Sequence, residues 1–154
     1  MTFSCVRNRL PMKLLCDVNV LLALVAQRHA AHESVKAWWQ ALPIVETIFI
    51  ARPVQTGLLR LLCTEAVMGE DTVSLPHAWA MYAAMLASGR FAMTLESPGL
   101  DVAWERLCRP FGRSPKVVMD AYLAAFAISG GYRLATLDRA FEQYPKLVCI
   151  YPSG

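Results

Sequence analysis

The chain has 154 residues, of which 56% are hydrophobic and 18% charged, with a net charge of +3 at pH 7 and a pI near 8.7. This length fits one domain with a real core, and the composition excludes an intrinsically disordered chain. No apolar run reaches the roughly 18 uncharged residues of a membrane-spanning helix, and the mild positive charge permits nucleic-acid binding without establishing it.

The first residues, MTFSCVRNRLP, lack the apolar centre of a secretion signal. They also fit no element of the pattern that begins at Lys13. We therefore expect residues 1–11 to be an extension outside the fold and residues 12–154 to form the domain, with translation starting at Met12.

The cysteine pattern argues against both a disulfide framework and a zinc site. The five cysteines are odd in number, and none belongs to a C-x-x-C pair. Four lie in apolar strings, where cysteine behaves as a small hydrophobic residue. A reducing, cytoplasmic location is expected.

From Lys13 onwards, short apolar runs alternate with longer amphipathic segments. The predicted strands cover residues 13–16, 46–51, 90–95, 132–138 and 146–152. The predicted helices cover residues 20–26, 32–42, 52–62, 77–89, 100–108 and 116–131, with a polar break at 69–76. This alternation predicts an α/β domain, a three-layer α/β/α sandwich whose central sheet of four or five strands is mainly parallel.

Three aspartates stand out against this pattern. Asp17 directly follows the first predicted strand, Asp138 follows the fourth, and Asp120 lies in the last long helix. If the strands before Asp17 and Asp138 are neighbours, the carboxylates meet at the sheet edge where open parallel sheets bind ligands, with no obvious balancing lysine beside them. Hard oxygen ligands suit Mg²⁺ or Mn²⁺, and three like charges favour a cation.

Each aspartate also has an ordinary structural explanation. Asp17 and Asp138 are suitable N-caps for the helical segments that follow them. Asp120 is a poor cap because it lies inside an apolar helix, between Met119 and Ala121, so solvent exposure is its main alternative.

Four segments together resemble the PIN-domain ribonucleases, specifically the VapC-type toxins of bacterial toxin–antitoxin (VapBC) modules. The segments are LLCDVNVLLAL, VQTGLLRLL, VVMDAYLAAFAISGGYRLATLD and LVCIYP, and the similarity runs roughly from Met12 to Pro152. The resemblance implies a PIN-like fold and a Mg²⁺- or Mn²⁺-dependent endoribonuclease. It also implies a small cognate antitoxin and a homodimer. The catalytic and metal-binding positions of the family fall on Asp17, Asp120 and Asp138, and its supporting polar positions on Asn19 and Thr136.

One departure from the family lies in the third predicted helix. Many PIN domains carry a glutamate early in this helix, where this chain has Gly57 and Leu58. Glu65 lies too far along the chain to replace it, so metal binding should be weaker. Arg60, in the same helix, is a candidate phosphate contact, although a surface arginine is an equal alternative.

Basic residues near the aspartates are candidates for binding RNA. Arg113 and Lys116 precede Asp120, and Arg139 follows Asp138. Contacts of this kind supply affinity and salt dependence without sequence choice. The alternative is an ordinary solvated basic face.

The large apolar content predicts a surface for a partner. Such a surplus is hard to bury in one small domain, so part of it is expected to form a dimer surface or an antitoxin groove. The aromatic stripe around Trp79, Tyr82 and Met85 is assigned to the core.

Three other classes of protein share part of this pattern. A catalytically inactive PIN-like module that binds RNA or antitoxin is favoured by the missing glutamate and opposed by the three aspartates. A phosphorelay receiver needs paired acids after the first strand and a lysine after the last, and neither is present. A dinucleotide-binding domain needs G-x-G-x-x-G after the first strand, which is also missing.

Overall fold

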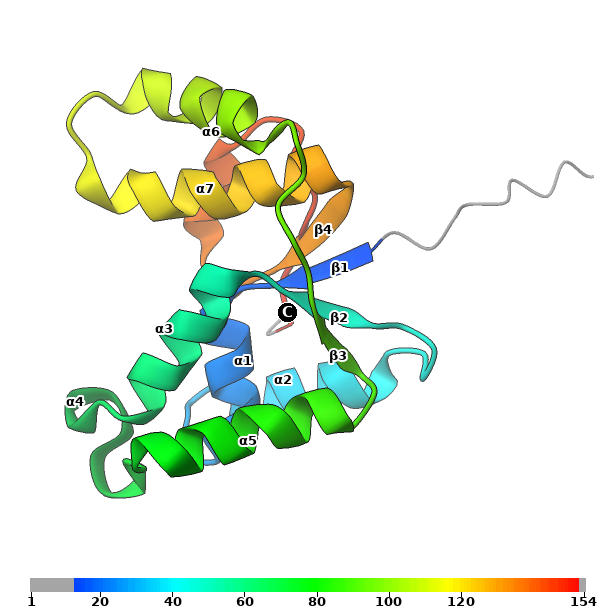
Figure 1. The fold of residues 1–154 in the computed structure, drawn as a ribbon, viewed down its shortest axis with the longest axis vertical. Coiled ribbons are helices and arrows are strands. Elements are labelled where there is room, and N and C mark those ends of the chain that lie inside the picture. The colour runs from blue at the N-terminus through cyan, green and yellow to red at the C-terminus, as the bar shows by residue number, and fades with distance from the viewer. Residues whose placement is uncertain (1–12, 153–154) are drawn as a thin grey trace, which may run out of the picture.

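Five short parallel strands form the centre of the computed structural model, which describes residues 13–152 (Figure 1). They lie in the order β3-β2-β1-β4-β5. Their bounds are β1 (Lys13–Cys16), β2 (Ile48–Ile50), β3 (Phe91–Met93), β4 (Tyr132–Ala135) and β5 (Cys149–Ile150). The predicted parallel sheet is confirmed, whereas the expectations for residues 1–11, Met12 and Cys5 lie outside the described residues.

Two groups of helices cover the two faces of this sheet. On one side lie α1 (Val18–Val25), α2 (His32–Ala41), α3 (Arg52–Leu62) and α5 (Leu75–Ala87) (Figure 1). On the other lie α6 (Leu100–Cys108) and α7 (Pro115–Gly130). Short elements complete the chain: α4 (Glu65–Met68) and the 3₁₀ turns η1 (Gly69–Asp71), η2 (Arg109–Phe111) and η3 (Arg139–Gln143). The three-layer architecture is therefore as predicted.

The central strand β1 has apolar contacts on both faces. Leu14, Leu15 and Cys16 are fully buried, as expected for a short continuous apolar run in a parallel sheet. β1 pairs with β2 on one side and with β4 on the other, so the strands that precede Asp17 and Asp138 are neighbours, as the sequence analysis assumed.

The order of the strands creates a switch point between β1 and β4. From β1 the chain continues to β2 on one side, whereas from β4 it continues to β5 on the other. The crevice outside the carboxyl ends of two such strands is where open α/β sheets bind ligands. The fold therefore predicts a ligand-binding site beside the residues that follow β1 and β4.

Two local expectations about α5 need correction. The helix begins at Leu75 instead of residue 77, because the Ser74 hydroxyl caps it by accepting a hydrogen bond from the His77 N–H at 3.3 Å. Its aromatic stripe is also only partly core: Tyr82 and Met85 are buried, but Trp79 is 49% exposed. The exposed Trp79 lies on the side of α5 that faces α3, where it lines a groove.

Two further observations concern the described residues as a whole. Between Lys13 and Pro152, no helix is both long and apolar enough to cross a membrane. The four cysteines in this range are all free thiols.

The end of α7 gives a test of the fold. Gly131 caps this helix in the left-handed region, with φ 73° and ψ 37°, where a side chain costs about 1 kcal/mol or slightly more. We expect Gly131→Ala to lower the free energy of unfolding by about that amount, measured by urea denaturation. Gly131→Asn is the matched control and should lose less, because asparagine tolerates this region. Equal losses in both variants would contradict the conformational explanation.

Candidate active site

Asp17 lies at the junction of β1 and α1 and is only 8% exposed. Its Oδ1 accepts a hydrogen bond from the Val18 N–H at 2.7 Å, and its Oδ2 accepts one from the Thr136 hydroxyl at 2.7 Å. Asp17 therefore does cap α1, as the structural alternative supposed. A carboxylate has about four lone-pair sites, however, so these two bonds leave it free to accept further ligands.

Hydrogen bonds of Thr136 and Asn19 join the segments that follow β1 and β4. The fully buried Thr136 hydroxyl also accepts hydrogen bonds, from the Asp138 N–H at 3.1 Å and from the Asn19 side-chain amide at 3.5 Å. The Asn19 carbonyl oxygen in turn accepts from the Leu137 N–H at 3.2 Å. Both polar residues singled out by the resemblance thus belong to one network that orients Asp17 and the backbone before Asp138.

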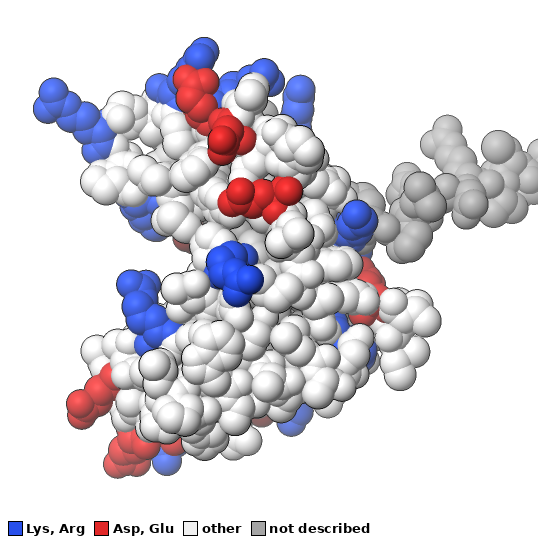
Figure 2. Space-filling model, in the orientation of Figure 1, with Lys and Arg blue, Asp and Glu red and all other residues white. Residues whose placement is uncertain are grey.

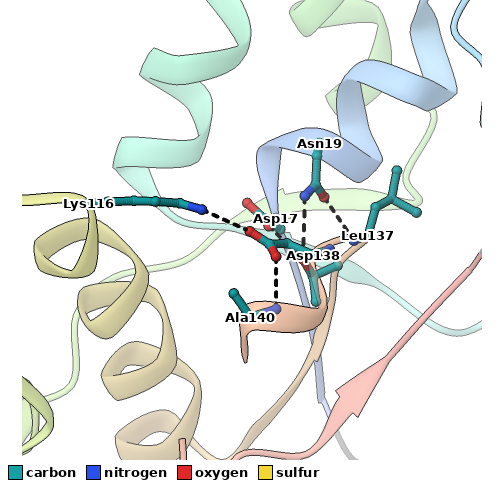
Figure 3. Close-up of polar contacts among 7 residues, drawn as sticks. Asp17, Asn19, Lys116, Leu137, Asp138 and Ala140 are labelled. Carbon is teal, nitrogen blue, oxygen red and sulfur yellow. Dashed lines mark hydrogen bonds and ion pairs between the residues drawn. The ribbon is translucent and has the colours of Figure 1, made fainter. Parts of the chain in front are cut away.

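Asp138 follows the end of β4 and has two partners. Its Oδ1 caps η3 by accepting from the Ala140 N–H at 2.8 Å, and its Oδ2 lies 3.7 Å from the Lys116 ammonium group (Figure 3). The expectation that no lysine balances the carboxylates is therefore wrong. Lys116 is in the first turn of α7, which begins at this edge of the sheet, so its long side chain reaches Asp138.

Asp120 shares a cavity with Asp17. It is partly exposed on α7, and the cavity has a volume of about 150 Å³. The remaining walls come from α1, α3, α7 and η3, and the residues are Val18, Pro53, Val54, Met119, Tyr122, Leu123 and Phe141. Solvent exposure alone, the alternative explanation for Asp120, does not describe a carboxylate that lines a cavity together with a second one.

Burial and nearby carboxylates raise the pKa of Asp17 and of Asp120. Burial raises the pKa of Asp17, the hydrogen bonds from Thr136 and Val18 partly oppose this, and the charges of Asp120 and Asp138 raise it further. Burial also raises the pKa of Asp120, which Lys116 lowers and Asp138 raises. The pKa of Asp17 and of Asp120 therefore lies above its usual value, because burial and neighbouring carboxylates disfavour the ionised form of both groups.

This donor set fits a hard divalent cation that keeps part of its water shell. Carboxylate oxygens are the ligands that Mg²⁺ and Mn²⁺ prefer. Within residues 13–152, no three His, Cys, Asp or Glu side chains form a complete ligand group for one ion. Asp17 and Asp120 together nevertheless suit Mg²⁺, which is commonly held by one or two carboxylates plus water.

The helix that lacks the family glutamate packs tightly beside the site. A Cβ atom at Gly57 would lie 3.3 Å from the Val18 Cγ2, so the close contact between α1 and α3 favours glycine there. Glu65 is exposed in α4 and is not among the residues that line the cavity. Neither position therefore supplies the missing carboxylate.

The other basic residues named from the sequence lie at varied distances from the carboxylates. Arg113 is exposed in the connection before α7. Arg139 directs its guanidinium group to Glu142, at 3.1 Å, and over the ring of Tyr151, at 3.7 Å. Arg60 lines the separate groove between α3 and α5. Of these four basic residues, Lys116 alone is paired directly with one of the three aspartates in the described part of the chain.

Three residues around the site were not predicted from the sequence. Tyr122 lines the cavity, and its hydroxyl donates a hydrogen bond to the Glu96 carboxylate at 2.7 Å. Arg52 is the first residue of α3 and precedes the cavity residue Pro53. Glu96 follows β3 closely, as Asp17 follows β1. A carboxylate just after a predicted strand was therefore the signal that could have found it.

Comparison with known proteins agrees with this geometry. Residues 14–147 match the model of the PIN domain family, so the chain belongs to this family. It is 41% identical over 135 residues to Ribonuclease VapC41 of Mycobacterium tuberculosis, covering 85% of this chain and 92% of that relative. The family resemblance inferred from the sequence is confirmed.

Solved structures show the same fold. One is VapBC2 from Rickettsia felis bound to a DNA fragment from their promoter, with a TM-score of 0.65 and 14% identity over 91% of this chain and 98% of that chain. Another is VapC20 from Mycobacterium tuberculosis, a sarcin–ricin-loop-cleaving toxin, with a TM-score of 0.62 and 22% identity over 84% and 93%. At these identities the likeness concerns the fold.

The raised pKa of Asp120 predicts a pH-dependent effect on stability. Because the folded state binds this proton more tightly than the unfolded state, the carboxyl group costs stability as pH rises above its unfolded pKa of about 3.9. In metal-free buffer we expect Asp120→Asn to be more stable than wild type at pH 7, with the difference vanishing towards pH 3. Thermal denaturation across this range measures it. A wild type that is the more stable form at pH 7 would contradict the electrostatic account.

Proposed function

We propose that this chain is a metal-dependent endoribonuclease toxin that cleaves RNA phosphodiester bonds and is neutralised by a cognate antitoxin. The observation that carries the proposal is the convergence of Asp17, Asp120 and Asp138 at the switch point of the sheet, where the pKa values of Asp17 and Asp120 are raised. The name of its relative, Ribonuclease VapC41, supports the same activity.

Asp17 and Asp120 would hold Mg²⁺ or Mn²⁺, and Asp138 would orient the attacking water or support a further ion. When bound, the cation lowers the pKa of a water molecule and stabilises charge on the phosphate. Thr136 holds the Asp17 carboxylate through its hydroxyl, so the carboxylate is oriented before any ligand arrives. Asn19 fixes the adjoining backbone by accepting from the Leu137 N–H.

Lys116 and Arg113 would bind the RNA backbone at the mouth of the cavity. Figure 2 shows basic side chains on both sides of the hollow between α3 and α7. Lys116 is 74% exposed, so its pairing with Asp138 is readily exchanged for a phosphate. Arg139 is paired with Glu142, and Arg60 lines the groove between α3 and α5. Each would have to give up this position to bind RNA at the cleaved bond, or would bind RNA farther from it.

The proposed protein partners, the antitoxin and a second copy of the chain, need an apolar surface. The groove between α3 and α5 offers one, with a volume of about 570 Å³ and with Leu59, Leu75 and Trp79 in its walls. Leu75 and Trp79 are 56% and 49% exposed. This groove supports a protein partner, and the free thiols are in keeping with the proposed cytoplasmic location.

A second candidate function is an inactive PIN-like module that binds RNA or antitoxin. It is favoured by the close contact of Gly57 with Val18, which leaves α3 without a carboxylate at that position. The two functions differ in whether the protein cleaves RNA and binds a cation through Asp17 and Asp120.

The decisive test removes these two carboxylates separately. We expect Asp17→Ala and Asp120→Ala each to abolish cleavage of total RNA, about a thousandfold or more, because they remove several kcal/mol of transition-state stabilisation. Calorimetric titration with Mn²⁺ should lose its saturable binding in both variants. Asp101→Ala, which removes an exposed acidic residue from α6, is the control and should retain both properties. Cleavage that survives either site substitution would overturn the assignment, and a folded wild type without cleavage or Mn²⁺ binding would favour the inactive module.

Thr136 gives a finer test of how the site is held. Thr136→Val keeps the shape of the side chain but removes the hydrogen bond to Asp17, so Mn²⁺ affinity should fall about 10–100-fold. Thr136→Ser should restore most of it, which a purely packing role would not predict. Thr64→Val is the matched control, because the Thr64 hydroxyl donates to the Arg60 carbonyl at an exposed position away from the cavity. Unchanged Mn²⁺ affinity in Thr136→Val would remove Thr136 from the site.

A further inference from the structure

A second cavity adjoins the acidic one at the carboxyl ends of β2 and β3. Its volume is about 340 Å³, within the usual range of small-molecule sites. Tyr122 lines both cavities, and Arg52 of the second is followed directly by Pro53 of the first. The two hollows therefore share a wall along one edge of the sheet.

The polar groups of this second cavity are held in place by neighbours. The Tyr122 hydroxyl donates to the Glu96 Oε1 at 2.7 Å, and the Arg52 guanidinium group donates to the Gln55 side-chain oxygen. The Thr94 hydroxyl is hydrogen-bonded to the Tyr132 hydroxyl at 2.7 Å. Side chains fixed in this way lose little conformational entropy when a ligand binds.

The cavity combines a cation, a carboxylate and apolar surface. Arg52 and Glu96 are both exposed at its rim. Between them lie the 83% exposed Leu95 and the buried ring of Phe126. Figure 2 shows basic surface over the start of α3, acidic surface near α7, and uncharged surface between them.

This combination matches the phosphate group and the base of a nucleotide. Arginine suits a phosphate group because its planar donors match the phosphate oxygens. A glutamate carboxylate accepts hydrogen bonds from the exocyclic amino group of a base. Apolar side chains cover the face of a base that is not stacked in a helix. An RNA chain cleaved in the acidic cavity must also continue beyond it, and the second cavity lies next in line.

We propose that the second cavity binds the nucleotide adjacent to the cleaved phosphodiester bond. Arg52 binds its phosphate group, and Glu96, positioned by Tyr122, selects a base with an exocyclic amino group over uracil. This inference rests on the proposed ribonuclease function, which it deepens by adding a specificity site at the edge of the same sheet.

Binding of short RNA to uncleaving protein tests the phosphate contact. In an Asp120→Asn background, the affinities of fluorescently labelled hexaadenylate, hexacytidylate and hexauridylate are measured by anisotropy over a series of KCl concentrations. Arg52→Gln should weaken all three and reduce the slope of log affinity against log salt by about 0.7, the value for one phosphate on a single strand. Arg106→Gln removes the same charge from an exposed position on α6 and should leave the slope unchanged.

Glu96→Gln tests the choice of base in the same assay. Glutamine keeps an oxygen for the Tyr122 hydroxyl but presents an amide donor in place of the second carboxylate oxygen. The preference for hexaadenylate and hexacytidylate over hexauridylate should therefore fall about tenfold or reverse. The Glu96→Gln variant keeps the hydrogen bond from the Tyr122 hydroxyl, so its fold should be unchanged. Its thermal stability is measured as a separate check of the fold.

The outcomes separate this inference from the proposed function. An unchanged salt slope in Arg52→Gln, or an unchanged base preference in Glu96→Gln, would overturn the nucleotide site even if the wild type cleaves RNA. An effect of Arg52→Gln confined to antitoxin binding would do the same and assign the cavity to that partner. If the wild type cleaves no RNA but both variants show the expected changes in RNA binding, the nucleotide site is retained and the proposed nuclease activity is overturned.

Discussion

The parallel pairing of β1 with β4 determines where the candidate site forms. Cys16 lies opposite Ala135 in this pair, and the Asp17 N–H donates to the Ala135 carbonyl at 2.9 Å, so Asp17 and Thr136 leave the sheet together. A slip of one residue would turn every side chain of β1 to the opposite face and separate Asp17 from Thr136. The hydrogen bond between Asp17 and Thr136 therefore depends on this register.

The rest of the fold brings the remaining groups to this edge. Every residue of helix α7 from Ala121 to Ala127 is buried, and this packing fixes the direction of Asp120 one residue earlier. The N-terminal turn of α3 forms the opposite wall through Pro53 and Val54. Because these walls belong to packed helices and not to loops, the cavity shared by Asp17 and Asp120 is held with the rigidity of the core.

What was predicted from the sequence depended on local pattern. The strands, the layers and the positions of Asp17 and Asp138 follow from apolar runs that end in a carboxylate. Each of these features is determined by a few residues that are neighbours in the sequence. The pairing of Lys116 with Asp138 and of Tyr122 with Glu96 depends instead on how distant elements pack, so no local pattern indicated it. Trp79 shows the same limit, because apolar spacing identifies an amphipathic face without saying which residues another element covers.

The proposed chemistry and the stability of the fold are linked through the buried carboxylates. Asp17 is held almost fully buried with a raised pKa, so its charge lowers the stability of the metal-free protein near neutral pH, and two hydrogen bonds offset only part of this cost. Lys116 compensates little, because its ion pair with Asp138 is exposed to solvent. A cation that binds the folded state alone would stabilise the protein by mass action. The features that make Asp17 and Asp120 unfavourable in the free protein are thus the ones that suit them to bind such a cation.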